Sequence, residues 1–280
     1  MITRETIIEK LSQKYPQYRF IPTDVTKNGD VHLKGICIRD DSPIAPTIYT
    51  DSIIARSEGN LDKAIEIIGN IIDQHQAPDI DLTKLQSRDF ILERIRIGVQ
   101  KESDEKLVKH SVEEFPGMEA YLYFAENSEN RDMWSIKLNT ELLASANISE
   151  EIAWEKAEQN TFEATTLQSL SSVLAEMLGD GADNNMFDML PCEMYVLSNK
   201  EKVKGAASIL NHELLKNFAK EHDCSSLCVL PSSLHEAILV PLQGEYKIED
   251  FNAVVCEINA TELSPEDVLV NRAYVINFEE

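Results

Sequence analysis

The sequence predicts an α+β protein. Apolar residues recur at helical spacing in some segments and alternate as in strands in others, which indicates both kinds of element. Asn28-Gly29 stands between two strand-like runs, and Asn-Gly tolerates the positive φ angles of a tight hairpin turn. With 280 residues, 43% of them hydrophobic, the chain can bury a sizeable core.

Residues 1–80 are expected to form a helix, a β-hairpin and a second helix. Thr3 can cap a first helix that ends near Tyr15. Strand-like runs at 18–25 and 31–39 flank the hairpin turn. The second helix is predicted by apolar residues at helical spacing, namely Leu61, Ala64, Ile65, Ile68, Ile71 and Ile72.

Residues 81–185 are expected to form a middle α+β region, which begins after a polar connection around Pro78. Strands are predicted at 95–99, 119–124 and 133–138. Helices are predicted at 102–112, at 150–160 behind the cap Ser149, and at 167–178 before the cap Gly179.

Residues 186–280 are expected to follow the order β-α-β-β-α-β, which is the split βαβ order of a ferredoxin-like region. The strands are predicted at 194–198, 227–230, 235–241 and 273–278. The helices are predicted at 205–222 and 248–259. The sequence leaves open whether these regions are separate domains or one compact unit.

The net charge of −23 argues against two classes of partner. Phosphate binding needs clustered Lys and Arg, yet the chain has 26 basic against 49 acidic residues and no basic run. We therefore expect neither nucleic acid nor an anionic membrane as a partner.

Three features predict a cytoplasmic protein. No apolar stretch approaches the roughly 20 residues that cross a bilayer. The segment from Met1 to Glu5 lacks the basic start of an export signal and soon carries an acidic residue. The cysteines are too sparse for a disulfide scaffold, so we expect thiols at Cys37, Cys192, Cys224, Cys228 and Cys256.

Several short stretches stand out along the chain: Thr26-Lys27-Asn28-Gly29, Ser42-Pro43-Ile44-Ala45-Pro46-Thr47-Ile48-Tyr49, Met194-Tyr195-Val196-Leu197-Ser198-Asn199, Gly205-Ala206-Ala207, Leu230-Pro231-Ser232-Ser233-Leu234-His235-Glu236 and Asn259-Ala260-Thr261. In this order they resemble an uncharacterised bacterial family known only as a domain of unknown function. The resemblance spans nearly the whole chain. It implies an intracellular protein with no established reaction, and it gives no catalytic residues to carry over.

The sharpest catalytic candidate is the segment that contains Ser232, Ser233, His235 and Glu236. A serine nucleophile needs a nearby base, and a histidine can serve if an acid orients it. Neighbours on a strand point to opposite faces, however, so His235 and Glu236 would not face each other. Serines that bond the local backbone of a turn explain the segment better, and we assign no catalytic residue.

The weak candidates for a metal site are His222, Cys224, Cys228 and His235, because thiolate and imidazole are the usual zinc ligands. Their spacing matches no common zinc pattern, and Cys228 lies in an apolar run, where a buried cysteine acts as a small hydrophobe. Residues 179–185 carry oxygen ligands but lack the alternation of a calcium loop. Since phosphate-loop and dinucleotide motifs are also missing, we expect no metal and no cofactor.

The sequence leaves the biochemical function unknown and favours a non-catalytic cytosolic protein that binds another protein or itself. One alternative is a hydrolase centred on the turn from Ser232 to Glu236, which would need one of its serines within hydrogen-bond reach of a histidine in a cleft. The second alternative is an acidic nucleic-acid mimic, which would need carboxylates in one stripe at phosphate-like spacing.

Overall fold

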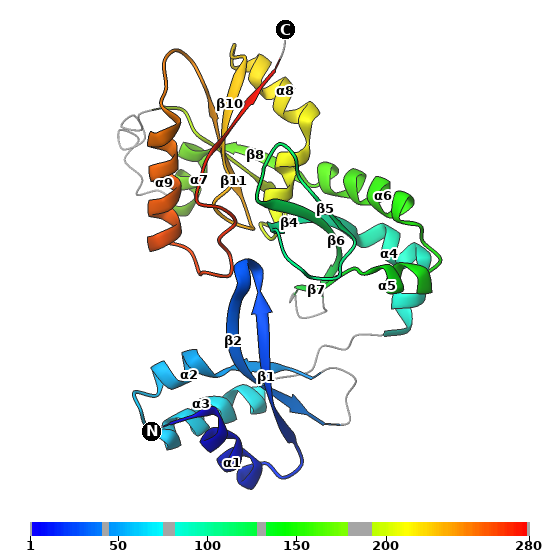
Figure 1. Ribbon diagram of the computed structural model, residues 1–280, viewed down its shortest axis with the longest axis vertical. Helices are drawn as coiled ribbons and strands as arrows, with labels where there is room; N and C mark the ends of the chain where they lie inside the picture. The colour runs from blue at the N-terminus through cyan, green and yellow to red at the C-terminus, as the bar shows by residue number, and fades with distance from the viewer. Residues whose placement is uncertain (1, 41–44, 75–81, 128–132, 179–191, 279–280) are drawn as a thin grey trace. The chain divides into compact units, whose positions relative to one another are not determined.

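The computed structural model describes residues 2–40, 45–74, 82–127, 133–178 and 192–278. Helices and antiparallel sheets are mixed along the chain, which confirms the predicted α+β class (Figure 1). Contacts within the chain define two compact units, Met1–Ile80 and Asp81–Glu280. The regions 81–185 and 186–280 thus lie together in the second unit. The predicted cap Gly179 and the polar loop 179–185 fall outside the described residues.

The first unit contains the predicted helix, hairpin and second helix, with a short strand and a short helix between them. Its elements are α1 (Arg4–Lys14), β1 (Arg19–Lys27), β2 (Val31–Arg39), β3 (Thr47–Tyr49), α2 (Thr50–Arg56) and α3 (Leu61–Gln74). The strands pair in the order β1-β2-β3. The three helices pack on this sheet around a core that includes Ile7, Leu11, Ile36 and Ile68.

Local sequence explains where α1 begins and where the hairpin turns. Thr3 accepts a hydrogen bond from the Thr6 amide, so the expected N-terminal cap is confirmed. Lys27 pairs with Val31, which leaves the turn to Asn28, Gly29 and Asp30. Gly29 has φ 71° and Asp30 has φ 58°, the left-handed backbone that glycine adopts without strain.

The second unit begins with helices around a four-stranded antiparallel sheet. The strands are β4 (Ile95–Lys101), β5 (Lys109–Ser111), β6 (Met118–Asn127) and β7 (Met133–Lys137). One edge of β6 pairs with β4, while its other edge pairs with β5 and β7 at different positions. The helices are α4 (Arg88–Arg94), α5 (Thr140–Ser145) and α6 (Glu150–Glu163), after a short 3-10 turn at Leu82–Gln86.

The helix predicted at 102–112 is wrong. Residues 102–108 form no helix, and Lys109–Ser111 is the strand β5. Ser103 and Glu105 are held by hydrogen bonds to side chains of the sheet, and such tertiary contacts outweigh a moderate helix propensity.

The outer edge of β4 is covered by α6, which the cap Ser149 starts as expected. The amide of Ile97 donates to the Thr161 hydroxyl at 2.9 Å, and the Asn160 amide donates to the carbonyls of Leu92 and Ile95 at 2.9 Å each. Side chains of α6 thus replace a neighbouring strand, and the edge offers few groups for pairing with another chain.

The chain then builds a five-stranded antiparallel sheet. Its strands are β8 (Thr165–Ser169), β9 (Tyr195–Asn199), β10 (Ser226–Leu230), β11 (Ala237–Pro241) and β12 (Tyr274–Asn277). The helices are α7 (Leu170–Leu178), α8 (His212–Glu221) and α9 (Ile248–Thr261), with a 3-10 helix at Gly205–Leu210.

Three predicted boundaries in this part need correction. The start of the helix expected at 167 belongs to β8, because Leu167 pairs with Leu197. The helix expected at 205–222 is divided at Asn211, whose side chain caps α8 by accepting from the Leu214 amide at 3.0 Å. The strand expected from His235 begins at Ala237, because the His235 amide donates to the Ser233 hydroxyl instead of joining the ladder.

The six elements from β9 to β12 occur in the predicted order β-α-β-β-α-β. The strand order of the sheet, β12-β10-β11-β9-β8, differs from a ferredoxin-like sheet in the place of the last strand. A ferredoxin-like sheet pairs its fourth strand with its first. Here β8 occupies that edge of β9, so β12 pairs with β10.

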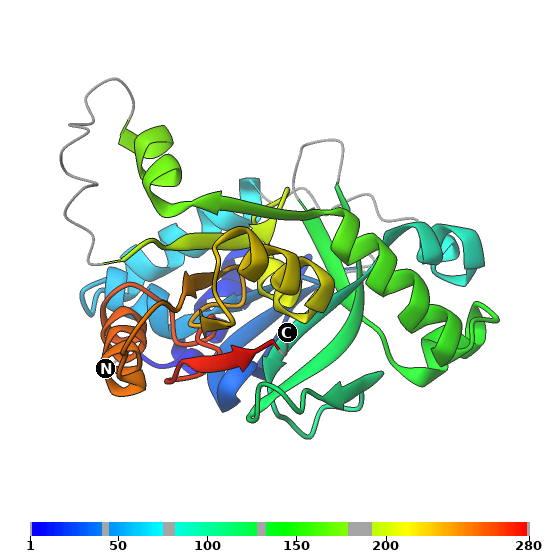
Figure 2. The same cartoon turned by 90° about the horizontal axis from the view of Figure 1, so that it is seen from above.

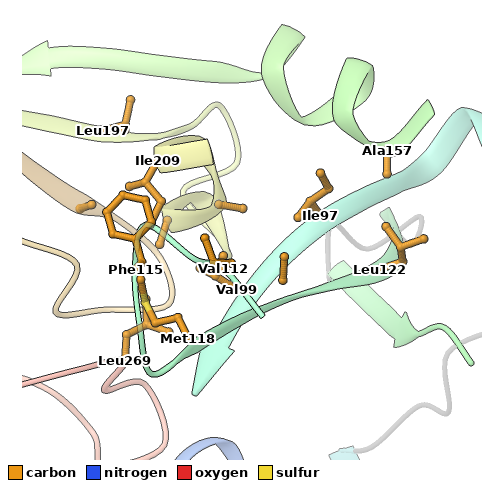
Figure 3. Packing of buried hydrophobic residues seen from close by; sticks show 14 of the residues in the cluster. Ile97, Val99, Val112, Phe115, Met118, Leu122, Ala157, Leu197, Ile209 and Leu269 are labelled. Atoms are coloured by element: carbon orange, nitrogen blue, oxygen red, sulfur yellow. The ribbon is translucent and has the colours of Figure 1, made fainter. Parts of the chain in front are cut away.

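This strand order places the two long helices on opposite faces of the sheet. Leu227 and Val229 of β10 share a core with Phe218 of α8, whereas Cys228 of the same strand packs with Val255 of α9. The core on the α8 side continues into the four-stranded sheet, as Ile97, Val99 and Leu122 show in Figure 3. Both faces of β10 and β11 are therefore buried.

Candidate functional site

In the 232–236 segment the hydroxyl of Ser233 bonds the backbone of the turn, as predicted, whereas Ser232 contributes its backbone carbonyl. Ser233 is buried, and its hydroxyl accepts from the His235 amide at 3.0 Å. The carbonyl of Ser232 accepts from the Leu269 amide at 2.9 Å, which ties the turn to a distant segment. Glu236 is exposed. This arrangement fixes the chain before β11 begins.

Both nitrogens of the His235 ring face groups other than these serines. Nδ1 accepts from the Lys204 amide at 3.2 Å, and Nε2 lies 3.4 Å from Oδ1 of Asp267. Because Nδ1 is an acceptor, the neutral ring carries its proton on Nε2 and directs it at a carboxylate. A general base would instead direct a free nitrogen at the nucleophile. Among the described residues, the imidazole forms no hydrogen bond with Ser232 or Ser233.

The weak metal candidates are divided among separate environments. The His222 ring lies 3.6 Å from a Glu193 oxygen, and Cys224 Sγ donates to the Ala219 carbonyl at 3.5 Å. Cys228 is buried on the α9 face, and burial raises the pKa of its thiol to about 12. In the part of the chain that the structure describes, no group of three or more His, Cys, Asp or Glu residues could hold a metal ion.

Cys228→Ser is expected to lower the free energy of unfolding by about 1–3 kcal/mol, because a hydroxyl would be buried among apolar side chains without a partner. The exposed Cys256 provides the control, and Cys256→Ser is expected to change stability by less than about 0.5 kcal/mol. Urea unfolding with and without a chelator measures both effects. Equal losses in the two variants, or a lower melting temperature with chelator, would contradict a structural role for Cys228.

An open groove of about 350 Å³ lies beside α8, at the β8 edge of the five-stranded sheet. Its apolar floor is formed by Leu167 of β8 and by Leu214 and Phe218 of α8. Among the described residues, the polar lining contains carboxylates and amides but no basic side chain: Asn211, Glu213, Asn217 and Glu221. We call this feature the α8 groove. It combines an apolar floor with an acidic rim.

An aromatic cluster holds the floor of the α8 groove in place. Phe218 lies edge-on to Tyr195, with ring centroids 4.8 Å apart, and the His222 ring is 4.4 Å from Phe218. The Tyr195 hydroxyl donates to Glu193 at 3.0 Å, and the same carboxylate lies near His222. His222, considered above as a metal ligand, therefore supports the groove.

The strand beside the groove is an edge of its sheet. Within the described residues β8 pairs with β9 alone, so its other side has no strand partner (Figure 2). An unpaired strand edge presents backbone N–H and C=O groups to which an extended segment can add.

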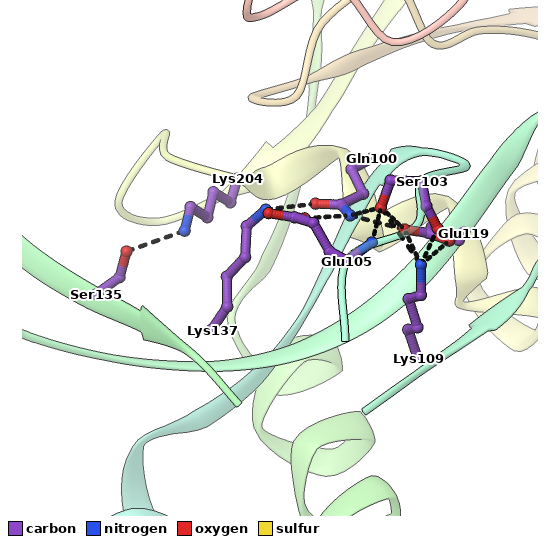
Figure 4. A network of polar contacts seen from close by, with 8 residues as sticks. All are labelled: Gln100, Ser103, Glu105, Lys109, Glu119, Ser135, Lys137 and Lys204. Atoms are coloured by element: carbon purple, nitrogen blue, oxygen red, sulfur yellow. Dashed lines mark hydrogen bonds and ion pairs between the residues drawn. The ribbon is translucent and has the colours of Figure 1, made fainter. Parts of the chain in front are cut away.

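A polar network lies on the four-stranded sheet and was not predicted (Figure 4). Lys109 contacts both oxygens of Glu119, at 3.1 and 2.9 Å, and the Ser103 hydroxyl donates to the same carboxylate at 2.7 Å. Gln100 donates to Glu119 at 2.7 Å and accepts from Lys137 at 2.8 Å. Oε1 of the carboxylate accepts from Gln100, Ser103 and Lys109, and Oε2 pairs with Lys109, which suits a structural role.

Burial by itself raises the pKa of the Glu119 carboxyl, yet hydrogen bonds from Gln100, Lys109 and Ser103 outweigh it and hold the pKa below its ordinary value. The same balance lowers the pKa of Glu105, through hydrogen bonds from Lys137 and Gln100. Both groups are therefore ionised at neutral pH. Lys109 Nζ donates to the Ser103 hydroxyl at 3.3 Å, which is the reverse of the contact that a base would make with it.

Sequence reasoning did not identify the α8 groove. The apolar spacing of Leu214, Leu215 and Phe218 indicates a buried helix face, but it cannot show that Leu214 stays half-exposed while Leu215 is fully buried. In the structure Leu215 lies in the core, whereas Leu214 lines the groove together with Leu167 of β8.

None of the helices within the described residues is both long and apolar enough to span a bilayer. Neither a curated protein nor a solved structure matches the chain. The family of unknown function DUF5688 matches residues 3–277, which is nearly the whole sequence. The resemblance noted in the sequence is thereby confirmed, and the chain belongs to the family DUF5688.

Proposed function

We propose that this protein binds another protein, without catalysing a reaction, and that the α8 groove is the binding site. The observation that carries the proposal is the apolar floor of Leu167, Leu214 and Phe218 beside a strand edge with no partner among the described residues. Apolar surface that is framed by polar side chains favours association with another chain.

The partner we propose is an extended segment with alternating apolar and basic side chains. Added to β8 as a further strand, it would direct every second side chain into the groove. Basic residues would face the carboxylates of Glu213 and Glu221, which are exposed on the rim. Two copies of this chain would bring acidic rims together, so a different, basic partner is favoured over self-assembly.

Co-purification from the native cell, combined with charge reversal on the rim, tests the proposal. Glu213→Lys with Glu221→Lys is expected to weaken binding of a stoichiometric partner by about tenfold or more, because both rim charges change sign. The matched control is Glu249→Lys with Glu257→Lys, an equal charge change at exposed positions of α9. Binding is measured by titration of the purified partner.

Several results would contradict this function. Equal weakening in the rim and control variants would show that overall charge attracts the partner. Sedimentation of the purified chain as a dimer that Leu214→Glu dissociates would favour self-assembly. A stoichiometric small molecule in place of a protein would favour an enzyme or a sensor.

A further inference from the structure

A second concavity lies on the polar side of the four-stranded sheet, away from the α8 groove. It is a hollow of about 50 Å³ between β4, β6 and the segment that follows β9. The side chains that matter for its chemistry are Arg94, Arg96, Tyr123, Glu126, Asn199 and Glu201. This volume is far below the roughly 300 Å³ of a drug-sized site, so it suits a single small group.

Tyr123 is a largely buried residue that lines the hollow. The residue is 3% exposed, and within the described residues its hydroxyl has no hydrogen-bond partner. Burial raises the pKa of Tyr123 to about 12, so the hydroxyl keeps its proton at neutral pH. The Lys204 ammonium lies 4.4 Å from the ring centroid and adds positive charge nearby. A hydroxyl that belongs to the lining of the hollow and has no hydrogen-bond partner within the described residues can donate to a ligand bound there.

The two arginines of the hollow are held differently. Arg94 lies 2.8 Å from Glu93 and 3.6 Å from Glu126, and it stacks on Phe90 at 4.1 Å. Arg96 donates to the Ile95 carbonyl at 3.2 Å and forms no ion pair within the described residues. In a chain of net charge −23, a half-buried arginine without a carboxylate partner has donors to spare.

From these contacts we infer that the hollow binds a small oxyanion group, a carboxylate or a phosphate, through the Arg96 guanidinium and the Tyr123 hydroxyl. The planar fork of arginine matches two oxygens of either group, and the tyrosine supplies a further donor. Arg94 is shared between Glu93 and Glu126 and compensates part of their charge, whereas the exposed Glu201 opposes the anion from the rim. The site therefore suits a single charged group rather than a polyphosphate.

Titration of the full chain with sodium phosphate and with sodium acetate, each against sodium chloride at equal ionic strength, tests this inference. We expect saturable binding of at least one of these anions in the millimolar range, followed by calorimetry or by amide shifts in NMR spectra. Arg96→Gln and Tyr123→Phe are each expected to weaken it at least about tenfold. Saturable binding of acetate would identify the ligand group as a carboxylate, and saturable binding of phosphate would identify it as a phosphate.

Arg39→Gln is the matched control, because Arg39 is exposed on β2 in the first unit and loses the same charge. Tyr123→Phe keeps the ring beneath Lys204, so it tests the hydroxyl alone if Arg96→Gln fails to fold. Absence of saturable binding of both anions would overturn the inference, as would equal weakening in Arg39→Gln. The rim variants of the α8 groove are expected to bind the anion as the wild type does, which separates this site from the proposed function.

Discussion

Lys109→Met is expected to lower the free energy of unfolding of the second unit by about 3 kcal/mol, because it leaves the Glu119 carboxylate buried without its cation. The Glu119 side chain is only 6% exposed, and that of Lys109 is 19% exposed. Chemical denaturation followed by circular dichroism measures the loss. Lys106→Met removes the same charge at an exposed position nearby and is expected to change stability by less than about 0.5 kcal/mol.

The double variant Lys109→Met, Glu119→Gln separates the ion pair from general packing. It is expected to recover part of the loss, because no charge is then left buried.

The contribution of Glu119 to stability depends on pH in a direction that its pKa determines. The pKa of Glu119 is lowered in the folded state, so its stabilising contribution is present above the pKa of the unfolded chain and is lost as pH falls through the folded value. A Lys109→Met penalty that grows on acidification would contradict the ion-pair explanation.

Phe124→Ala is expected to cost about 3–5 kcal/mol, since it removes a fully buried ring and leaves a cavity. Phe124 packs edge-on to Phe90 and Trp134, with centroid distances of 6.2 and 5.3 Å, so the loss includes aromatic contacts beyond buried area. Urea unfolding measures the change. Val254→Ala on the exposed side of α9 is expected to cost less than about 0.5 kcal/mol, and a similar loss in both variants would contradict the packing of Phe124.

The elements that the sequence predicts correctly are determined by interactions between residues that are close together in the chain. Thr3 caps α1, and Asn28-Gly29 turns the hairpin, because these side chains and backbone angles act on their immediate neighbours. The apolar stripe of α3 is equally local, since it needs only one face to be buried.

The parts that were not predictable depend on distant residues. The sequence of residues 102–108 is compatible with a helix, but Gln100 bonds Ser103 and Glu105, and Ser103 donates to Glu119, so the segment is held in another conformation. The pairing of β12 with β10 depends on β8, which lies far upstream in the chain and occupies the edge beside β9. No spacing within 186–280 carries that information.

The same distinction applies to the candidate sites. The turn from Ser232 to Glu236 is a candidate site in the sequence because its reactive groups are adjacent, yet the His235 ring faces Asp267 and the Lys204 amide. The hollow of about 50 Å³ combines Arg96 with Tyr123, which pair across the neighbouring strands β4 and β6. Pairing across the sheet, and not proximity in sequence, creates that arrangement.

The burial of both faces of β10 and β11 limits how these strands can diverge among relatives. A strand with one solvated face accepts polar residues at every second position. In this sheet Val229 and Leu239 face the α8 side, while Cys228 and Val240 face the α9 side, and each of the four is at most 1% exposed. Neutral drift at these positions is therefore confined to apolar residues of similar volume, so sequence change in this part of the family must accumulate in the surrounding loops and the outer faces of the helices.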